Sequence, residues 1–415
     1  MTEAGLFVQP GAVVRGRFHH IVRGHGAGRL GRTVALATTL ALAACQTIVP
    51  RGPVDQPETR PVPTTPRPST EPEAGLPRDT ARHRIALLVP LSGSNAGVGQ
   101  SIANATMMAL LDAQADTIRI TNYDTANGAG AAAQKAIAEG AQLILGPLLS
   151  EDVRAVAPVA HAARVPVISF SNDVGVAGNG TYLMGYTPAQ SIDRVVTYAR
   201  GRGVTTFAGL VPNGLYGERA STAFLRAVEG AGGQVVSLQP YGRVAGGIGA
   251  AAQRLNAKAP YDAVLIADGG ATAAVAAPIL KRGSGATTRL LGTELWNSES
   301  GIASRAALNG AWFASVSNTL YRQYATKYRA RFKAAPYRLS SLGYDSVLLT
   351  VRIARDWKMN APFPEARLRA SDGFAGIDGA FRFGRDGVAE RALEVQELRD
   401  GTAVTVSPAP TGFGG

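Results

Sequence analysis

The stretch "RIALLVPLSGSNAGVGQSIANATMMAL" occupies residues 84–110 and decides the fold class of this chain. Its first eight residues, 84–91, form a short apolar run that is typical of a buried strand. A glycine-rich loop follows, and over residues 98–114 apolar side chains such as Val98 and Ile102 recur at helical spacing. Strands that alternate with helices form parallel sheets covered on both faces, so this segment predicts an α/β protein.

The same alternation continues for about 200 residues. It yields too many strands for one compact sheet, so we expect two doubly wound lobes with a cleft at the carboxyl ends of the strands. Lobe I would span about 84–187 and 316–358, and lobe II about 188–315 with the C-terminal strands. The further strands are expected at 118–124, 142–146, 166–170, 206–212, 234–238, 262–268 and 289–292. The further helices are expected at 129–139, 151–163, 189–201, 217–230, 247–257 and 272–282.

The last third of the chain contains an aromatic and basic segment at 320–338, which we expect to be helical. One stripe of this helix is aromatic and its remaining surface is basic, with no acid in the segment. The basic residues form either an ordinary solvated face or a docking face for an anionic partner. The stripe consists of Tyr321, Tyr324, Tyr328 and Phe332, and the basic residues are Lys327, Arg329, Arg331 and Lys333. A helix at 340–357 and two strands joined near Asp386-Gly387 should follow.

The N-terminal region explains the position of Cys45, which is the only cysteine among 415 residues. Five arginines precede an apolar run at 34–44 that is too short to span a bilayer, for which about 20 residues are needed. These features are typical of an export signal. The stretch Leu42-Ala43-Ala44-Cys45 resembles a bacterial lipobox, which implies that residues 1–44 are a lipoprotein signal peptide and that Cys45 is lipidated. The alternative is a plain signal peptide with an incidental cysteine.

A proline-rich segment at 45–83 separates this anchor from the folded body. Residues 46–83 contain nine prolines and almost no periodic apolar residues, so we expect a disordered tether. At about 3.1 Å per residue it would reach roughly 100 Å. With a lipid anchor, the body would be a periplasmic protein held at a membrane, and we expect the outer membrane.

Composition excludes several functional classes. The net charge is +12, and about +8 remains after the region before Cys45, yet no motif or dense basic block indicates nucleic-acid binding. Histidine is nearly absent beyond residue 90, and no catalytic or phosphate-binding motif is present. We therefore expect neither an enzyme nor a metal or cofactor site. A carboxylate pair for glycoside cleavage among Asp124, Asp173 and Glu294 is the remaining catalytic hypothesis.

Several motifs resemble type I periplasmic binding proteins of the branched-chain amino-acid class. After residues 85–110, the matching stretches are "LILGPLLSEDV" (143–153), "VPVISFSND" (165–173), "YGERASTAF" (216–224) and "LGYDSV" (342–347). The resemblance covers about residues 84–400. It implies a bilobal, leucine-binding-protein-like domain over residues 84–415.

A narrower set of motifs resembles the lipoprotein activators of penicillin-binding proteins. It includes "LLGTELWN" (290–297) and "FAGIDGAFRFGRDGVAER" (374–391). This resemblance implies a non-catalytic protein that docks on a penicillin-binding protein and stimulates peptidoglycan synthesis. The N-terminal helical-repeat domain of the enterobacterial activators is not matched here, so its role is not implied.

The resemblance to amino-acid-binding proteins also implies a candidate ligand cleft. Ser150 matches a serine that binds the ligand carboxylate, and Glu294 matches the acid that pairs with the ligand ammonium. Asp173 stands in place of a threonine and Ala271 in place of an aromatic residue, which argues against a free amino-acid ligand. Ser150 could also cap the helix that starts beside it. The full candidate set is Ser92, Ser150, Ser171, Asp173, Glu294 and Trp296.

Two functions therefore compete. The first is regulation of a penicillin-binding protein through surface contacts. The alternative is a solute-binding lipoprotein of an ABC importer for amino acids or related small polar ligands.

Overall fold

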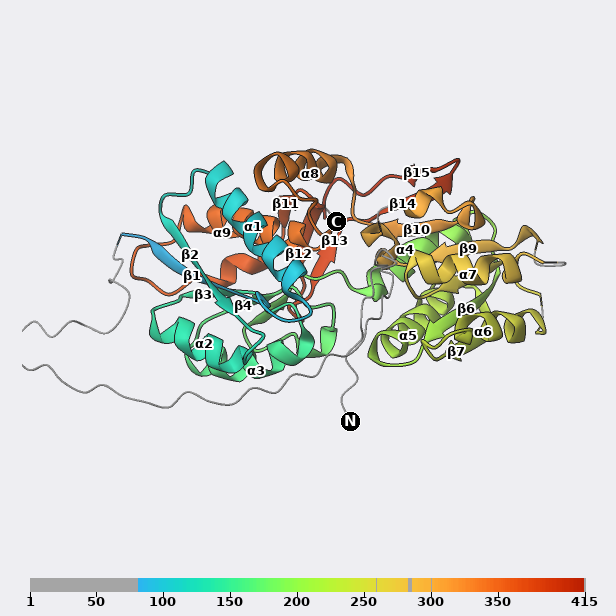
Figure 1. Ribbon diagram of the computed structural model, residues 1–415, viewed down its shortest axis with the longest axis horizontal. Helices are drawn as coiled ribbons and strands as arrows, with labels where there is room; N and C mark the ends of the chain where they lie inside the picture. Colours follow the sequence, from blue (N-terminus) through green and yellow to red (C-terminus); the bar gives the residue numbers. More distant parts are fainter. Residues whose placement is uncertain (1–80, 259, 283–285, 300, 414–415) are drawn as a thin grey trace, which may run out of the picture. The chain divides into compact units, whose positions relative to one another are not determined.

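The computed structural model describes residues 81–258, 260–282, 286–299 and 301–413 (Figure 1). The predicted signal peptide, Cys45 and nearly all of the predicted tether lie outside these residues. The described residues form two lobes, each built on one main sheet. The sheet of lobe I has five strands, all parallel, in the order β2-β1-β3-β4-β5. They are β1 (His83–Val89), β2 (Ile118–Asp124), β3 (Leu143–Leu145), β4 (Val167–Ser169) and β5 (Thr181–Leu183).

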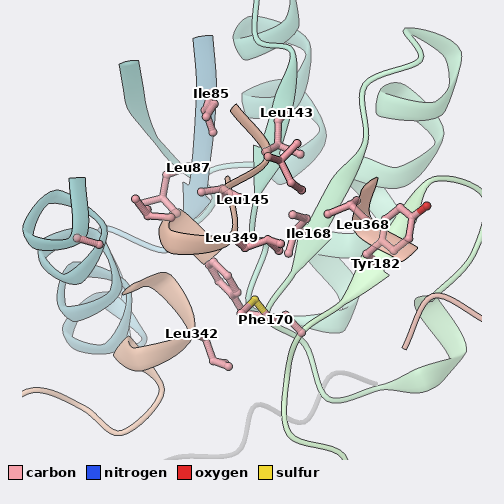
Figure 2. Close-up of a cluster of buried hydrophobic side chains, with 14 of the residues drawn as sticks. Ile85, Leu87, Leu143, Leu145, Ile168, Phe170, Tyr182, Leu342, Leu349 and Leu368 are labelled. Carbon is pink, nitrogen blue, oxygen red and sulfur yellow. The ribbon is translucent and has the colours of Figure 1, made fainter. Parts of the chain in front are cut away.

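Helices cover both faces of this sheet. Successive side chains of β1 point to opposite faces, as the period of a strand requires. Ile85 and Leu87 pack into the cluster that contains Leu342 and Leu349 (Figure 2). The intervening Ala86 and Leu88 pack into a second cluster. The helices on the first face are α1 (Ala96–Asp112) and α9 (Ser340–Ala354), and those on the second are α2 (Ala129–Ala138) and α3 (Ser150–Ala162).

Lobe II contains a seven-stranded sheet in the order β15-β14-β10-β9-β8-β6-β7. The last five strands in this order are parallel, and β14 and β15 add antiparallel pairs at the other edge. The strands are β6 (Thr206–Pro212), β7 (Gln234–Tyr241), β8 (Ala263–Ile266), β9 (Arg289–Gly292), β10 (Trp312–Ser315), β14 (Glu394–Arg399) and β15 (Thr402–Ser407). Helices α4 (Pro188–Gly201) and α5 (Leu215–Gly230) cover one face, and α6 (Gly247–Asn256) and α7 (Gly270–Leu280) cover the other. The predicted two-lobe α/β architecture is confirmed.

A third, small antiparallel sheet belongs to lobe I, because Phe374, Phe381 and Phe383 join the core of that lobe. Its strands are β11 (Phe374–Gly376), β12 (Gly379–Phe383) and β13 (Ala389–Arg391). Strands β12 and β13 pair across the turn that contains Asp386 and Gly387, as the sequence predicted. Short 3-10 helices complete the described segments: η1 (Val174–Val176), η3 (Glu294–Ser298), η4 (Ile302–Ser304), η5 (Ala306–Leu308) and η6 (Glu365–Arg369).

Helix α8 (Thr319–Phe332) packs on α1, and the predicted aromatic stripe faces inward. Tyr324 and Tyr328 are buried against Ala105 and Met108 of α1. The helix ends six residues earlier than the sequence predicted, because Lys333 adopts a left-handed conformation with φ of 56°.

The chain passes between the lobes three times. The connections are residues 184–187 between β5 and α4, 316–318 between β10 and α8, and 392–393 between β13 and β14. These three segments meet at the pocket described below.

One glycine in each lobe allows a helix to approach the preceding strand closely. A methyl group on Gly99 of α1 would lie 1.7 Å from the carbonyl oxygen of Pro90, and one on Gly217 of α5 would lie 1.6 Å from that of Pro212. No side chain fits at such distances. The two lobes therefore share the same strand-loop-helix motif. The close contact between helix and strand fixes the position of the loops at the carboxyl ends of β1 and β6.

Candidate functional site

The loop after β1 brings Ser92 to the carboxyl edge of the lobe I sheet. Its hydroxyl donates to Asp124 Oδ2 at 2.6 Å, and the Leu91 amide donates to Oδ1 at 2.8 Å. The hydrogen bond from Ser92 is the main reason why the pKa of Asp124 is lowered. Ser92 therefore serves to hold the loop against the end of β2.

Ser150 lies at the start of α3, but it is not the helix cap. Leu149 occupies the cap position and makes no side-chain cap. The Ser150 hydroxyl instead accepts a hydrogen bond from Arg154 Nη1 at 3.3 Å, one turn along the helix. The predicted capping role is wrong, because Ser150 already lies inside the helix.

Asp173 is the best-connected member of the predicted cleft. Its Oδ2 lies 2.5 Å from Nη2 of Arg154, and its Oδ1 accepts from the Gly175 amide at 3.0 Å. Nη2 of Arg219, which comes from α5 of lobe II, lies 3.5 Å from the same Oδ1. Only 4% of the Asp173 side chain is exposed. The sequence led us to expect a free negative charge here, but two guanidinium groups neutralise it.

Ser171 supports the same loop. Its hydroxyl accepts a hydrogen bond from the Asp173 amide at 3.2 Å, and its own amide donates to Ser169 Oγ at 3.0 Å. The residue is buried. Its hydroxyl therefore helps to orient Asp173.

Glu294 is buried at the start of η3, and both of its carboxylate oxygens have partners inside the protein. Ser191 Oγ donates to Oε2 at 2.6 Å and the Tyr216 hydroxyl donates to Oε1 at 2.9 Å. Burial raises the pKa of Glu294, and it also raises the pKa of Tyr216. Any ligand ammonium would have to displace one of these partners. Tyr216 lies in the quoted stretch 216–224, so the sequence offered a signal for it that our candidate set did not use.

Trp296 lies in the core of lobe II. Its ring is fully buried and packs at a tilt against Phe313, and its Nε1 donates to the Asp268 carbonyl oxygen at 2.9 Å. A methyl group on Gly292 would lie 2.2 Å from this ring. The Trp296 side chain is thus part of the hydrophobic core and does not line an open cleft. Ala271 lies in α7, and its amide donates to Glu299 Oε2 at 2.9 Å.

A small pocket lies where the three connections between the lobes meet. Its walls include Tyr186 from the first connection, Val316 from the second and Leu393 from the third, together with Arg391 at the end of β13 and Glu294. The cavity volume is about 10 Å³, the space of about one water molecule. The structure therefore brings Glu294 to this pocket, while Ser92, Ser150, Ser171, Asp173 and Trp296 are not among the residues of its wall.

The three acids of the glycosidase hypothesis take part in separate hydrogen-bond networks. Asp124 binds the loop after β1, Asp173 binds two arginines, and Glu294 binds Ser191 and Tyr216. Within the described ranges no group of three or more His, Cys, Asp or Glu side chains could hold a metal ion. In the same part of the chain, no helix is both long and apolar enough to span a membrane.

The four basic residues of the candidate docking face are all exposed, but they are not equivalent. Lys327 Nζ lies 2.6 Å from Asp112 Oδ2 of α1, and Lys333 Nζ donates to the Ala330 carbonyl at 2.9 Å. Arg329 and Arg331 make no ion pair with any residue that the structure describes. These two guanidinium groups are therefore the ones free to meet a partner.

Comparison with known proteins agrees with the two-lobe fold. An ABC transporter substrate-binding protein from Sphaerobacter thermophilus is similar in structure, with a TM-score of 0.66 at 20% identity, covering 80% of this chain and 98% of that chain. A branched-chain amino acid transporter substrate-binding protein from Streptococcus pneumoniae, in complex with isoleucine, gives a TM-score of 0.60 at 18% identity, covering 79% and 100%.

Among curated proteins, an uncharacterized protein from Rickettsia prowazekii (strain Madrid E) is 31% identical over 139 residues, which make up 33% of this chain and 37% of that relative. The match thus spans little more than a third of the relative. Residues 83–403 match the family described as periplasmic binding protein. This match covers most of the chain, which therefore belongs to the periplasmic binding protein family.

Proposed function

We propose that this protein is a non-catalytic lipoprotein of the cell envelope that activates a penicillin-binding protein, and that it acts through its surface and not through a captured solute. The observation that carries this proposal is that the two acidic groups of the candidate cleft are already bound by other side chains of the protein. Asp173 pairs with Arg154 and Arg219, and Glu294 is held by hydrogen bonds on both oxygens. An amino acid would need these same groups free.

The basic face of α8 supports docking on an acidic surface. Arg329 and Arg331 are exposed, and the buried tyrosines of the same helix fix it against α1. Charges at the rim of an interface mainly increase the rate of association with a partner of opposite sign. We place the contact with the synthase on this face.

The lipid anchor and tether proposed from the sequence would place the body in the periplasm, next to enzymes that build the cell wall. Cys45 would be acylated, and the proline-rich segment after it would let the body reach a partner roughly 100 Å away. We infer an outer-membrane location, which makes this reach necessary.

The test is a reconstituted synthesis reaction. The full-length lipidated protein in detergent is added to a purified bifunctional penicillin-binding protein, and glycan polymerisation and peptide crosslinking are followed. The proposal expects both rates to rise saturably with the lipoprotein concentration. An unchanged rate with every synthase of the parent organism would contradict it.

Solute binding for an ABC importer is the second candidate. It is favoured by the isoleucine complex of the similar Streptococcus pneumoniae protein and by the proximity of Glu294 and Tyr216 in this chain. A thermal-unfolding screen against amino acids, amides and muropeptides separates the two. A true ligand at 100 times its dissociation constant adds about 2.7 kcal/mol to the free energy of unfolding. No shift with any solute would remove this candidate.

A further inference from the structure

A side chain of helix α4, which belongs to lobe II, covers a strand edge of lobe I. Strand β13 lies at the edge of the small antiparallel sheet, where β12 is its neighbour on one side. Gln190 of α4 lies on the other side. Its Nε2 donates to the Ala389 carbonyl oxygen at 2.7 Å, and its Oε1 accepts from the Arg391 amide at 2.9 Å. One amide side chain thus forms the hydrogen bonds that a neighbouring strand would form.

The same pattern continues into the third connection. Arg194 lies about one turn further along α4, and its Nε donates to the Leu393 carbonyl oxygen at 3.1 Å. Backbone groups of alternate residues in an extended chain point to the same side, so residues 389, 391 and 393 all face α4. The intervening Ala392 amide donates instead to a carbonyl oxygen of β12 at 3.0 Å. Helix α4 therefore binds the chain as it passes from lobe I to lobe II.

The first connection is bound by groups of lobe I. Nη2 of Arg391 donates to the Met184 carbonyl oxygen, and the Tyr186 hydroxyl donates to Asp378 Oδ2. Met184 and Thr187, at the two ends of this connection, are buried. The first and third connections are therefore tied to each other through Arg391.

The second connection is bound by lobe II. Nδ2 of Asn297, which lies in η3, donates to the Val316 carbonyl oxygen at 3.3 Å. Oδ1 of the same side chain accepts from Asn318 Nδ2 at 2.6 Å. Val316 is buried. A single asparagine side chain thus holds both ends of the connection 316–318.

These contacts bear on the relative motion of the lobes. Two lobes joined by short segments are expected to move relative to each other, through changes in the backbone torsion angles of a few residues. In each of the three connections, however, a backbone oxygen accepts a hydrogen bond from a side chain. The cavity between the connections holds about one water molecule. A torsion change there would leave buried acceptors without donors, which is unfavourable.

We infer that Gln190 and Arg194 hold the connections in one conformation, so that the two lobes move as one rigid body and do not open and close around a solute. The contact between Arg219 of lobe II and Asp173 of lobe I adds to this restraint. A partner then meets a surface whose shape is fixed before contact. The inference rests on the connections alone and does not depend on which protein the partner is.

The direct test measures the distance between the lobes. Gln134 of α2 and Gln253 of α6 are exposed, and each is replaced by cysteine in the full-length protein and labelled with a nitroxide. The protein also carries Cys45→Ser, so that no other thiol reacts. Pulsed electron spin resonance should give one narrow distance peak that amino acids, amides and muropeptides leave unchanged. Two peaks, or a peak that shifts with any of these solutes, would overturn the inference.

A pair of substitutions tests the role of α4. Gln190→Ala with Arg194→Ala removes the hydrogen bonds to β13 and to the third connection, so the distance distribution should widen. Amide hydrogen exchange over residues 389–393 should become roughly tenfold faster, because the Arg391 amide loses its acceptor. Asp193→Ala alters an exposed residue of the same helix and should leave both measurements unchanged.

A distance peak of unaltered width in the double variant, together with unaltered exchange at 389–393, would contradict the assignment to α4. If the double variant does not fold, hydrogen exchange in Gln190→Ala replaces it. The distance measurement with Gln190 and Arg194 in place decides separately whether the lobes move as one body.

Discussion

Asp173 and Arg219 join the two lobes through a charged contact: Arg219 Nη2 of α5 lies 3.5 Å from Asp173 Oδ1, in the loop after β4. The carboxylate is buried, while 44% of the arginine side chain is exposed. Asp173 also binds Arg154 of its own lobe at 2.5 Å. One carboxylate therefore anchors a loop of lobe I and reaches a helix of lobe II.

The first prediction concerns this contact. Arg219→Gln should reduce the free energy of unfolding by about 0.5–1 kcal/mol, because the guanidinium is partly solvated. Asp173→Asn should reduce the free energy of unfolding further, because it also breaks the ion pair with Arg154. A double-mutant cycle by urea unfolding measures the coupling. Strict additivity of the two substitutions would show that the pair contributes nothing in solution.

The second prediction concerns the close approach of α1 to β1. Gly99→Ala should destabilise the protein by about 3 kcal/mol, because the new methyl group would overlap the Pro90 carbonyl oxygen. Gly201→Ala is the matched control: this glycine lies in α4 with open space around it, so stability should stay constant or rise slightly. Similar stabilities of the two variants would contradict this account of the loop.

The third prediction is a pH dependence. Burial, and next the charge of Asp378, raise the pKa of Asp345 to about 7, while Arg391 acts in the opposite direction. The folded state therefore keeps a proton that the unfolded chain has lost, so this contribution to stability is present at low pH and is lost as the pH rises towards 7.

Asp345→Asn should remove that loss. Between pH 5 and pH 8 the free energy of unfolding of the variant, relative to that of the unaltered protein, should rise by about 2 kcal/mol. Urea unfolding at the two pH values measures this difference. Asp356→Asn alters a carboxylate that is 62% exposed, and its effect should be the same at both pH values. An equal effect of Asp345→Asn at both pH values would contradict a raised pKa.

The fourth prediction concerns the anchor. Cys45→Ser should prevent lipidation, because the thiol is the group that would carry the lipid. Metabolic labelling with radioactive palmitate should mark the unaltered protein and not the variant. Equal labelling of both would exclude lipidation at Cys45.

Much of the fold could be predicted from apolar periodicity, because each lobe repeats the same strand-helix unit. Strands 118–124, 206–212 and 289–292 have the predicted bounds. Strands β5 and β10 were not predicted. Length alone does not explain this, because β3 and β4 are as short as β5 and were predicted.

The candidate site could be predicted only in part. The resemblance to amino-acid-binding proteins identified Glu294 and Asp173, but not the partners that satisfy them, such as Ser191 and Arg219. These partners come from other helices, and only the tertiary fold brings them within hydrogen-bond distance. Arg391 was missed for the same reason, since nothing in its local sequence predicts burial.

The account's central claim is that the synthase is contacted by the basic face of α8 and not through a ligand in the cleft. The most direct measurement compares three variants of the full-length lipoprotein in the reconstituted synthesis reaction. Arg329→Glu with Arg331→Glu reverses two charges on α8. Lys258→Glu with Arg282→Glu makes the same charge change on exposed residues of lobe II. The third variant, Ser150→Ala with Glu294→Gln, alters the candidate cleft.

All three variants are first checked for folding by circular dichroism. The account predicts that the α8 variant associates with the synthase about tenfold more slowly and loses most of its stimulation, while the other two retain it. Loss of stimulation in the cleft variant, together with full stimulation by the α8 variant, would contradict the claim and indicate that a bound solute controls the protein.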